Sequence, residues 1–392
     1  MFHIFSEDQI KNAVITDVYF ERTIKIIKEK GLDKVVAAEV RARELPSDYR
    51  WAILGGIEEA LTLLEGLPVN VWAMPEGTLF HAMEPVLLIE GKYSDFAAYE
   101  TCLLGFLCQA SGIATRAARC KLASGGKPVY HFGARRMHPG ITLMIDRSSY
   151  IGGCDGVAVK ESARFLEEEP VGTIPHSLVL LAGDTLKSIK LFDEVIEPQV
   201  KRVALIDTLG DEKFEALRVA DELGRKLFAV RIDTPASRRG DILAILKEIR
   251  WELDLRGFNH VKLFVSGGLN EKKIRQLNQV ADAFGVGTWI SNAPVVDFAL
   301  DIVEIDKKPI AKKGKHSGKK QVWRCPACGA GRILPWSEDI PSCECGEKMV
   351  PLLKLMIREG KLVNPFPSVK KIRDFVLSQL KKLEKSEVED WL

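Results

Sequence analysis

Residues 202–208 read RVALIDT, residues 226–233 read KLFAVRID, and residues 261–268 read VKLFVSGG. Each stretch is a short apolar run, rich in residues that favour strands, and each ends in polar residues or glycine. Helix-length segments separate these runs, and strands that alternate with helices form a parallel sheet buried on both faces. The sequence therefore predicts an α/β fold organised as an irregular βα barrel. The other runs of this set are PVYHFGAR at 128–135, GVAVK at 156–160 and ADAFGVGT at 281–288, with LVLLAG at 178–183 as a weaker member.

The first 115 residues follow a different pattern, which predicts an N-terminal α+β domain. The helical spacing of Ile24 and Ile27 predicts a helix that ends at Gly31, because glycine is common just after a helix. Further predictions are a strand at 35–42 (VVAAEVRA), a helix within 49–66 (YRWAILGGIEEALTLLEG), a strand at 68–74 (PVNVWAM) and an antiparallel pair within 75–91 (PEGTLFHAMEPVLLIEG).

The chain has 392 residues, which is more than one hydrophobic core usually holds, so we expect two or three domains. The boundaries that we predict are 1–115 for the N-terminal α+β domain, 116–305 for the βα barrel and 306–392 for a C-terminal zinc-binding domain. Lys and Arg exceed Asp and Glu by only two, 56 against 54, so no global charge favours a nucleic acid, a membrane or a polyanion.

The N-terminal residues contain no apolar segment of the length that a signal peptide needs, since charged or amide residues interrupt every apolar stretch. The longest apolar runs elsewhere are also too short to span a bilayer. We therefore expect no membrane association and a cytoplasmic location.

The cysteines predict a structural zinc site near the C-terminal end. The sequence reads CPAC at 325–328 and CEC at 343–345, and a glycine follows each pair. Two close pairs on tight turns supply the four thiolates of a tetrahedral zinc site that is closed to substrate. A disulfide or a redox CxxC motif is the competing interpretation. The predicted ligands are Cys325, Cys328, Cys343 and Cys345, whereas Cys102, Cys108, Cys120 and Cys154 stand singly and are expected to be reduced core thiols.

Polar residues and glycines gather where the predicted barrel strands end, which is the edge where such barrels bind substrate. They include cations, two carboxylates and two glycine-rich turns, a set that suits a phosphorylated sugar and a divalent metal better than an apolar ligand. The alternative is that these charges only cap and solvate the barrel. The residues are Phe132, Arg135, Arg136, Lys160, Asp207, Arg231, Asp233, Ser266, Gly267, Gly268, Gly285, Gly287 and Thr288.

Three features of this edge have specific chemical interpretations. SGGL at 266–269 and FGVGT at 284–288 are turns whose backbone N–H groups can hold a phosphate, because glycine lets the backbone approach closely. Asp207 and Asp233 end successive strands and can bind Mg²⁺ or ribose hydroxyl groups. His176 lies in the loop GTIPHS, where a single histidine is as consistent with a structural role as with a catalytic one.

Taken in order along the chain, these motifs resemble the nicotinate phosphoribosyltransferase family, whose members are type II phosphoribosyltransferases. The resemblance covers roughly residues 10 to 300. The adjacent acids and phosphate loop that mark type I enzymes are absent from VALIDTLGD. The motifs are TDVY at 16–19, PEGTLF at 75–80, YETCLLGFLCQASGIATRAAR at 99–119, FGARR at 132–136, GTIPHS at 172–177, LIDT at 205–208, RIDT at 231–234, SGGL and FGVGT.

The resemblance implies an N-terminal α/β domain packed on an irregular barrel, with active sites shared between the subunits of a homo-oligomer that is at least a dimer. It implies that nicotinate and phosphoribosyl pyrophosphate form nicotinate mononucleotide and pyrophosphate, in NAD biosynthesis, with ATP as a co-substrate. It further implies Mg²⁺ as the cation of the reaction.

The resemblance also assigns roles to individual residues. Phe132 would stack on the pyridine ring, and the partner subunit's Tyr19 would cover the other face. Arg135 and Arg231 would meet anionic groups, Asp207 and Asp233 would serve the metal and the ribose, and His176 would be phosphorylated by ATP. The remaining substrate-binding positions are Lys160, Ser266, Gly267, Gly268, Gly285, Gly287 and Thr288, with the glycines on the 5′-phosphate.

The sequence departs from the family at two places. PASRRGD follows RIDT where many members have Ser-Gly, so no role is assigned to Arg238 and Arg239. MHPG follows FGARR in place of the usual small residues, so no further substrate contacts are carried over from the family at this point.

Several alternative functions stay open from the sequence. A quinolinate phosphoribosyltransferase shares the fold but needs extra cations for a second carboxylate, and GTIPHS and FGARR argue against it. A nicotinamide-using relative is not resolved from a nicotinate-using one. A zinc-ribbon nucleic-acid binder is consistent with the basic segment before Cys325, but the retained acids and His176 disfavour it. A sugar-phosphate aldolase would need a Schiff-base lysine, and Lys160 has no evident partner for that role.

Overall fold

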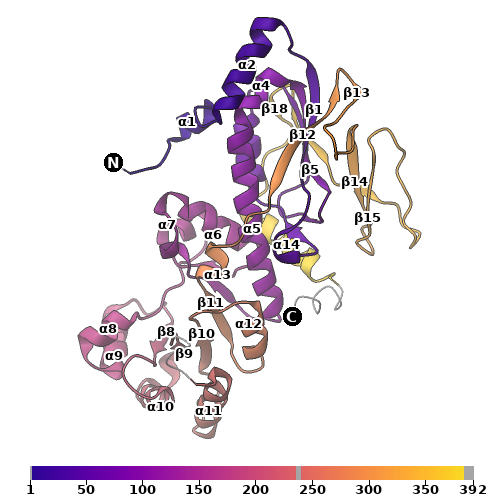
Figure 1. Cartoon of the computed structure of the whole chain (residues 1–392). Coiled ribbons are helices and arrows are strands. Elements are labelled where there is room, and N and C mark those ends of the chain that lie inside the picture. The colour runs from indigo at the N-terminus through magenta and orange to yellow at the C-terminus, as the bar shows by residue number, and fades with distance from the viewer. Residues whose placement is uncertain (1, 235–239, 384–392) are drawn as a thin grey trace. The chain divides into compact units, whose positions relative to one another are not determined.

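The computed structural model describes residues 2–234 and 240–383. The chain forms two compact units (Figure 1). The first, which we call the terminal unit, combines Met1–Thr115 with Ala293–Leu392, and the second, the barrel unit, is Arg116–Asn292. The two ends of the sequence therefore fold in one unit.

The terminal unit contains a seven-stranded antiparallel sheet in the order β13-β12-β1-β5-β3-β17-β18. Strand β1 pairs with β12 on one side and with β5 on the other. The segment 306–392, for which we predicted a domain of its own, thus supplies β13, β17 and β18 to a sheet that it shares with the N-terminal residues. The strands are β1 Val35–Ala42, β3 Asn70–Ala73, β5 Pro85–Lys92, β12 Phe298–Ile305, β13 Lys308–Pro309, β17 Lys354–Arg358 and β18 Lys361–Leu362.

Both faces of this sheet are covered by apolar side chains. Val36 and Val40 of β1 belong to the main core of the unit, whereas Ala37 points to the opposite face. There it packs with Leu88, and Trp336 lies against the same cluster. The period-two alternation of a strand explains how one apolar run of sequence fills two cores. The predicted strands at 35–42 and 68–74 are confirmed by β1 and β3.

The helix predicted to end at Gly31 is confirmed by α2 (Val18–Lys30), and Gly31 adopts a left-handed φ of 62°. The helix predicted within 49–66 is confirmed only over α3 (Ile57–Leu64), because β2 (Ala52–Ile53) precedes it. Gly56 explains the late start of α3. Its φ is 79°, and an added Cβ would overlap the backbone of α5 (Glu100–Ala123).

The antiparallel pair predicted within 75–91 is wrong in its pairing. Strand β4 (Leu79–Phe80) pairs with β2, while β5 pairs with β1 and β3. A turn separates β4 from β5: Met83 has a φ of 70°, and its N–H donates to the carbonyl of Ala42 at 2.8 Å. That contact redirects the chain, so the two strands cannot form a hairpin.

A smaller sheet in the order β15-β14-β16 holds the two cysteine pairs on its turns. Its strands are β14 Lys320–Arg324, β15 Gly331–Pro335 and β16 Val350–Pro351. The buried Glu39 of β1 accepts from the Lys320 ammonium at 3.0 Å and from the Lys320 N–H at 2.9 Å, which attaches this sheet to the larger one. The remaining elements of the unit are α1 Glu7–Lys11, α4 Tyr93–Phe96, α14 Val369–Leu380 and 3₁₀ turns at Pro46–Asp48 and Ala97–Tyr99.

The barrel unit is built on six parallel strands in the order β7-β6-β11-β10-β9-β8. The sheet curls but stays open, since no ladder joins β7 to β8 in the described part of the chain. This open form confirms the prediction of an irregular βα barrel. The strands are β6 Val129–His131, β7 Gly156–Val157, β8 Arg202–Leu205, β9 Leu227–Ile232, β10 Lys262–Val265 and β11 Ala283–Val286.

The weaker strand predicted at 178–183 is wrong, because these residues lie in helix α8 (His176–Ala182) and its cap Gly183. Leu180 and Leu181 are 61% and 87% exposed, so the apolar run is not a buried strand. Its composition resembles that of a core strand, but only Val179 is buried. Periodicity alone does not separate such a short apolar run from a helix.

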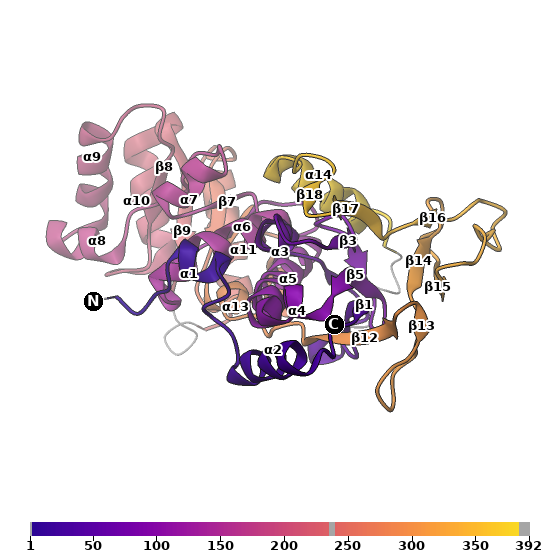
Figure 2. The same cartoon turned by 90° about the horizontal axis from the view of Figure 1, so that it is seen from above.

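Helices flank the barrel sheet, and α9 and α10 pack against β8 and β9 (Figure 2). Three of these helices start at aspartates whose carboxylates accept backbone N–H groups, namely Asp184, Asp211 and Asp241. Such caps satisfy donors that the first turn leaves free. The helices are α6 Thr142–Ile151, α7 Lys160–Phe165, α8, α9 Thr185–Val195, α10 Glu212–Leu223, α11 Ile242–Leu255, α12 Glu271–Leu277 and α13 Thr288–Ser291.

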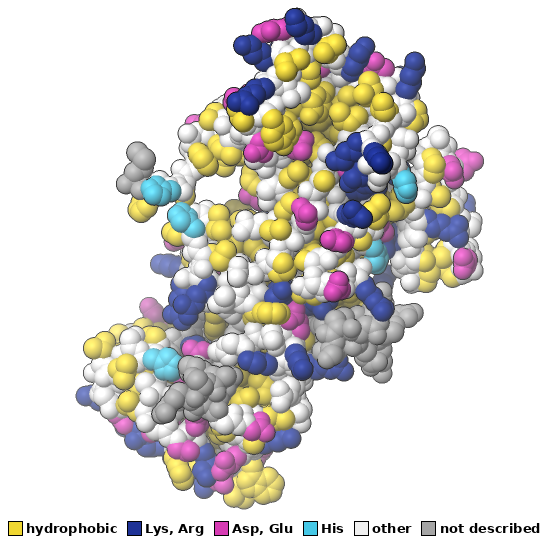
Figure 3. Space-filling view, in the orientation of Figure 1, with side chains coloured by type: hydrophobic (Ala, Val, Ile, Leu, Met, Phe, Trp, Pro, Cys, Tyr) yellow, Lys and Arg dark blue, Asp and Glu magenta, His cyan; other side chains and the backbone are white. Residues whose placement is uncertain are grey.

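The surface carries charges of both signs. Figure 3 shows Lys and Arg side chains interspersed with Asp and Glu over the visible face, in line with a formal net charge of +2. Among the described residues, no helix combines the length and the apolar character that crossing a membrane requires. Of the four single cysteines, Cys120 and Cys154 are buried, Cys102 and Cys108 are partly buried, and burial raises the pKa of the Cys120 thiol.

Two glycines of α5 provide a test of how tightly this helix packs. A Cβ on Gly112 would overlap the carbonyl oxygen of Pro294, whereas one on Gly105 would meet no atom within 4 Å. Gly112→Ala should therefore destabilise the protein by about 1–3 kcal/mol, from overpacking. The matched control Gly105→Ala should stabilise it by about 0.5–1 kcal/mol, from helix propensity. Urea unfolding measures both values, and equal effects would contradict the close contact with Pro294.

Candidate active site

Two aspartates at the strand ends form the centre of the site. Asp207 follows β8, and its Oδ2 accepts the Asp233 N–H at 2.7 Å and the hydroxyl of Thr234. The other oxygen, Oδ1, is buried and has no hydrogen-bond partner among the described residues. Because a buried carboxylate oxygen is costly without a partner, this atom is suited to bind a cation or a hydroxyl group.

Arg231 joins the ends of neighbouring strands through its guanidinium group. Nε donates to Ser266 Oγ at 2.9 Å, one terminal nitrogen donates to Thr173 Oγ1 at 2.5 Å, and the other lies 2.9 Å from Asp233 Oδ2. Ser266 in turn donates to Asp233 Oδ1 at 2.8 Å. The fork geometry of arginine thus fixes the orientation of the Asp233 carboxylate. The parallel register of β9 and β10 brings these residues together.

His176 is the first residue of α8 and faces the same cluster. Its Nδ1 lies 2.9 Å from Thr208 Oγ1, and its Nε2 lies 3.7 Å from Asp233 Oδ2. The side chain is 41% exposed, so Nε2 is accessible to a ligand as well as close to a carboxylate. A histidine held by a hydroxyl on one nitrogen and facing an acid with the other is arranged for transfer of a proton or a phosphoryl group.

Phe132 follows β6 and presents an aromatic ring beside the charged cluster. The Arg231 guanidinium carbon lies 5.6 Å from the centre of this ring, and the Phe264 ring lies 5.8 Å away. Gly285 of β11 is needed here, because an added Cβ would lie 2.7 Å from the Phe132 ring. The ring is partly exposed and is available for stacking on a planar ligand.

The two glycine turns differ in the physical reason for their glycines. Gly267 and Gly268 have φ values of 87° and 63°, which other residues rarely adopt, and an added Cβ at Gly267 would meet the Asp233 carbonyl at 2.9 Å. Gly287 has a negative φ and precedes α13, whose first residue is Thr288. The turn at 266–269 therefore needs glycine for its left-handed backbone. The turn at 284–288 needs glycine at Gly285, because a side chain there would overlap the Phe132 ring.

Two predicted residues of the barrel unit make no polar contact with this cluster among the described residues, and a third belongs to the terminal unit. Arg135, in a 3₁₀ turn (Ala134–Arg136), and Lys160, which begins α7, are exposed. No hydrogen bond or ion pair joins either side chain to the aspartates or Arg231 in the described part of the chain. Tyr19 lies on α2 in the terminal unit and is 55% exposed. Arg238 and Arg239 lie outside the described residues.

Several polar residues of this site were not predicted from the sequence. Thr173, Thr208 and Thr234 position Arg231, His176 and Asp207. Thr208 and Thr234 directly follow predicted aspartates, and Thr173 lies three residues before His176. His131, which directly precedes Phe132 in the sequence, and Asp146 were not predicted either. His131 Nδ1 and Asp146 Oδ1 are buried and lie 2.7 Å apart. Strand alternation places His131 inward, which was the available signal, but its partner on α6 is found only in the tertiary structure.

The four predicted zinc ligands converge. Their sulfur atoms lie within 4.8 Å of one another, with 3.5 Å between Cys325 and Cys345 and between Cys328 and Cys343. These distances exclude a disulfide, whose sulfurs lie about 2.05 Å apart, and suit a tetrahedral thiolate site. Backbone N–H groups, chiefly that of Cys328, lower the pKa of the Cys325 thiol to about 6. The Glu347 N–H lowers the pKa of the Cys345 thiol, but the neighbouring Cys325 and Cys343 sulfurs outweigh it and raise this pKa to about 12.

Comparison with known proteins agrees with this arrangement. The N-terminal and C-terminal domain models of quinolinate phosphoribosyl transferase match residues 17–111 and 113–301, and the nicotinate phosphoribosyltransferase C-terminal domain model matches residues 343–388. A nicotinate phosphoribosyltransferase from Mycobacterium tuberculosis is 32% identical over 354 residues, which cover 80% of this chain and 75% of that relative. The chain belongs to the nicotinate phosphoribosyltransferase family.

Other relatives extend this comparison. The nicotinate phosphoribosyltransferase of Bacillus subtilis is 26% identical, with 82% of this chain and 74% of that relative covered. The crystal structure of nicotinate-nucleotide pyrophosphorylase from Pyrococcus furiosus is 55% identical, with a TM-score of 0.96 and with 98% and 99% of the two chains covered. Human nicotinic acid phosphoribosyltransferase, at 20% identity and a TM-score of 0.78 over 95% of each chain, shares the fold.

The similarity to the nicotinate phosphoribosyltransferase family extends further along the chain than the sequence motifs indicated. We expected it to end near residue 300, and the match of the family's C-terminal domain to residues 343–388 shows that this expectation was wrong. The matched range includes Cys343 and Cys345 and the whole of α14. The short strands and polar loops of this region carry little periodicity, which explains why the motifs did not reveal the relationship.

Proposed function

We propose that this protein transfers the phosphoribosyl group of phosphoribosyl pyrophosphate to nicotinate, giving nicotinate mononucleotide and pyrophosphate, as a step of NAD biosynthesis. One observation carries the proposal: Asp207, Asp233 and Arg231 are joined at the strand ends, and Phe132 lies beside them. Carboxylates, a cation and an exposed aromatic face are the groups that a sugar phosphate and a planar heteroaromatic acid require.

The reaction needs little acid–base chemistry from the protein. The pyridine nitrogen has a lone pair and attacks C1 of the ribose as the bond to pyrophosphate breaks, so no general base is required. Positive charge develops on the sugar and negative charge on the departing oxygens. Asp207 and Asp233 stabilise the first, and Arg231 is placed to attract an anionic group. Stacking on Phe132 orients the ring, worth roughly 1 kcal/mol beyond burial of its area.

A divalent cation fits the aspartate pair, and Mg²⁺ is our proposal. The unpartnered and buried Oδ1 of Asp207 supports it, because this oxygen has no hydrogen-bond donor among the described residues. When bound, such a cation neutralises charge on the pyrophosphate. Asp207 and Asp233 would hold it, while Ser266 and Arg231 keep the Asp233 carboxylate in one orientation.

We further propose that His176 accepts a phosphoryl group from ATP. Its Nε2 is the more accessible nitrogen, because Nδ1 lies against the Thr208 hydroxyl. A phosphoryl group there would stand close to Asp233 and add negative charge beside the leaving pyrophosphate. Repulsion between these anions would favour release of pyrophosphate and so favour synthesis.

The assembly that we propose is a homo-oligomer, at least a dimer, in which the partner subunit's Tyr19 covers the nicotinate ring. Val18, Tyr19 and Ile26 on α2 are each more than half exposed, which supports a contact with another chain. The exposed Arg135 and Lys160 are proposed to contact the anionic groups of the substrates, together with Thr288 and the backbone of the two glycine turns.

Quinolinate is the alternative acceptor, since the two larger domain models carry its name. The direct test incubates the protein with Mg²⁺, labelled phosphoribosyl pyrophosphate and one of nicotinate, nicotinamide or quinolinate. We expect product with nicotinate and at least a tenfold lower rate with the other two, measured by chromatography. Turnover of quinolinate with release of carbon dioxide would show that quinolinate, and not nicotinate, is the acceptor. If none of the three compounds reacts, both proposed acceptors are refuted.

His176→Ala tests the role of ATP. Without the imidazole no phosphoryl group is accepted, so the ratio of the rates with and without ATP should fall to one, as measured by pyrophosphate release. Ser177→Ala is the matched control, because Ser177 is the exposed next residue of α8 and its loss should leave the ratio unchanged. A ratio in His176→Ala equal to that of the unmodified protein would show that the histidine is not the acceptor.

We propose that the four cysteines hold one structural zinc ion. Elemental analysis should find one zinc per chain, and Cys345→Ser should lose it, because three thiolates bind more weakly than four. Cys102→Ser, which removes a thiol outside the cluster, should keep the metal. Removal of zinc should lower the thermal midpoint and spare the catalytic groups. Full zinc content in Cys345→Ser would contradict the assignment.

A further inference from the structure

A large groove lies in the terminal unit, and none of the proposed catalytic residues belongs to its lining. Its volume is about 1200 Å³. Its walls come from the turn before β5, the small three-stranded sheet with its CPAC turn, and α14. The cavity is larger than a typical small-molecule site and is only partly enclosed, as a groove that accepts a peptide segment must be.

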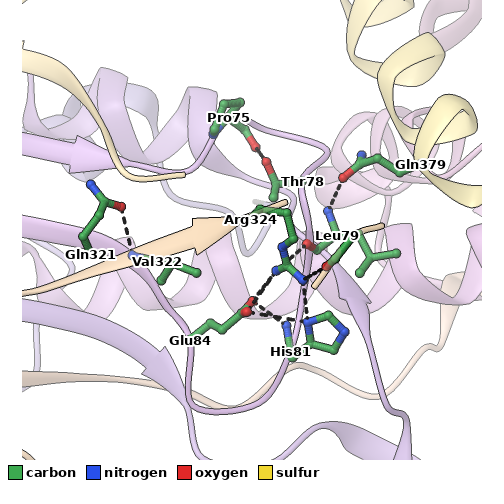
Figure 4. Close-up of polar contacts among 10 residues, drawn as sticks. Pro75, Thr78, Leu79, His81, Glu84, Gln321, Val322, Arg324 and Gln379 are labelled. Carbon is green, nitrogen blue, oxygen red and sulfur yellow. Dashed lines mark hydrogen bonds and ion pairs between the residues drawn. The ribbon is translucent and has the colours of Figure 1, made fainter. Parts of the chain in front are cut away.

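The floor of the groove is held by a buried ion pair (Figure 4). Both oxygens of Glu84 accept from the Arg324 guanidinium, at 2.9 and 2.8 Å. His81 closes the network, since its backbone N–H donates to Glu84 at 2.9 Å and its Nδ1 lies 3.1 Å from Arg324. Because Arg324 fully pairs with Glu84, the floor carries little net charge.

Hydrogen bonds hold the wall of the groove that α14 forms. Gln379 of α14 donates to the Gly77 carbonyl at 2.8 Å. It also accepts the Leu79 N–H at 2.9 Å (Figure 4). Lys382 donates to the carbonyl of Pro326 in the CPAC turn at 3.2 Å. These contacts fix the distance between α14 and the CPAC turn, so the groove is part of the folded structure of the terminal unit.

The lining combines apolar side chains with an excess of cations. Ile333, Val350 and Phe375 line the groove and are 38%, 45% and 40% exposed, although each is a large apolar residue. The cations of the lining besides Arg324 are Arg332, Lys354 and Lys382, and Glu84 is the one carboxylate among the described lining residues. Cys325 and Cys328 also line the groove, and as thiolates of the proposed zinc site they lower the excess of positive charge. Such a surface suits an acidic segment that also carries large apolar side chains.

We propose that this groove binds the segment of the same chain that follows it in sequence, residues 384–392. Leu383, the last described residue, already lines the groove. The next nine residues read EKSEVEDWL, with four acids against one lysine, together with Val388, Trp391 and Leu392. Their acids can pair with Lys354 and Lys382, whereas Arg332 already lies 3.6 Å from Glu344. Attachment at Leu383 gives the segment a high effective concentration at the groove.

The proposal is independent of the reaction that the enzyme catalyses, and a peptide-binding experiment on the full chain tests it. The probe is a fluorescein-labelled peptide of sequence EKSEVEDWL, whose affinity is measured by anisotropy. In the full-length tail variant Glu387→Lys, Glu389→Lys, Trp391→Ala the groove should be free, so the peptide should bind at least tenfold more tightly than to the unmodified protein, in which the native segment competes.

The groove itself is tested in the same tail variant. Adding Lys354→Glu should weaken peptide binding at least tenfold by placing a carboxylate opposite the acidic peptide. Lys361→Glu is the matched control, because Lys361 is an exposed lysine of β18 outside the groove and should leave binding unchanged. Thermal unfolding of each variant checks that the fold is kept.

Three outcomes would overturn the proposal. Equal peptide affinity for the unmodified protein and the tail variant would show that the native segment does not occupy the groove. Equal effects of Lys354→Glu and Lys361→Glu would show that the peptide binds elsewhere. If the unmodified protein binds more peptide as it is diluted, the competing segment comes from a second copy of the chain, and docking within one chain is refuted.

Discussion

The parallel pairing of the barrel strands is the constraint on which the site depends. Parallel strands all end at the same edge of a sheet, so residues that follow β6, β8, β9, β10 and β11 meet there although the chain separates them widely. For this reason Asp207 accepts the Asp233 N–H, and Arg231 donates to Ser266. A slip of one residue in any ladder would turn these side chains to the opposite face.

At this edge of the barrel sheet, partly buried charged groups make the site suitable for binding a cation or a substrate. The Asp207 carboxylate accepts the backbone N–H of Asp233, and the Arg231 guanidinium pairs with the Asp233 carboxylate. The buried Asp207 oxygen that has no partner among the described residues is a cost for the folded protein, and a bound cation or substrate would offset it. Hydroxyl groups of Thr173, Thr234 and Ser266 hold the charged groups in place without neutralising them.

In the terminal unit, two ion pairs with low exposure connect segments from opposite ends of the sequence. Lys320 meets Glu39, and Arg324 meets Glu84, so both cations of β14 bind to carboxylates of the N-terminal half. Burial raises the pKa of Glu39 although Lys320 is close, which shows that desolvation outweighs the attraction of the pair. The cysteine cluster follows directly after β14, so the proposed zinc ion would stabilise the turn next to these contacts.

The sequence by itself determined the strands at 202–208, 226–233 and 261–268, the polar residues at their ends, and the cysteine pairs, because short apolar runs and close ligand spacing are local properties. It misassigned residues 178–183 and the pairing of β4, since an apolar run does not specify whether neighbours will bury it. Only the tertiary structure decided the partner of His131, the threonines that orient Arg231 and His176, and the sharing of one sheet by both ends of the chain. These depend on contacts between residues far apart in sequence, which no local pattern records.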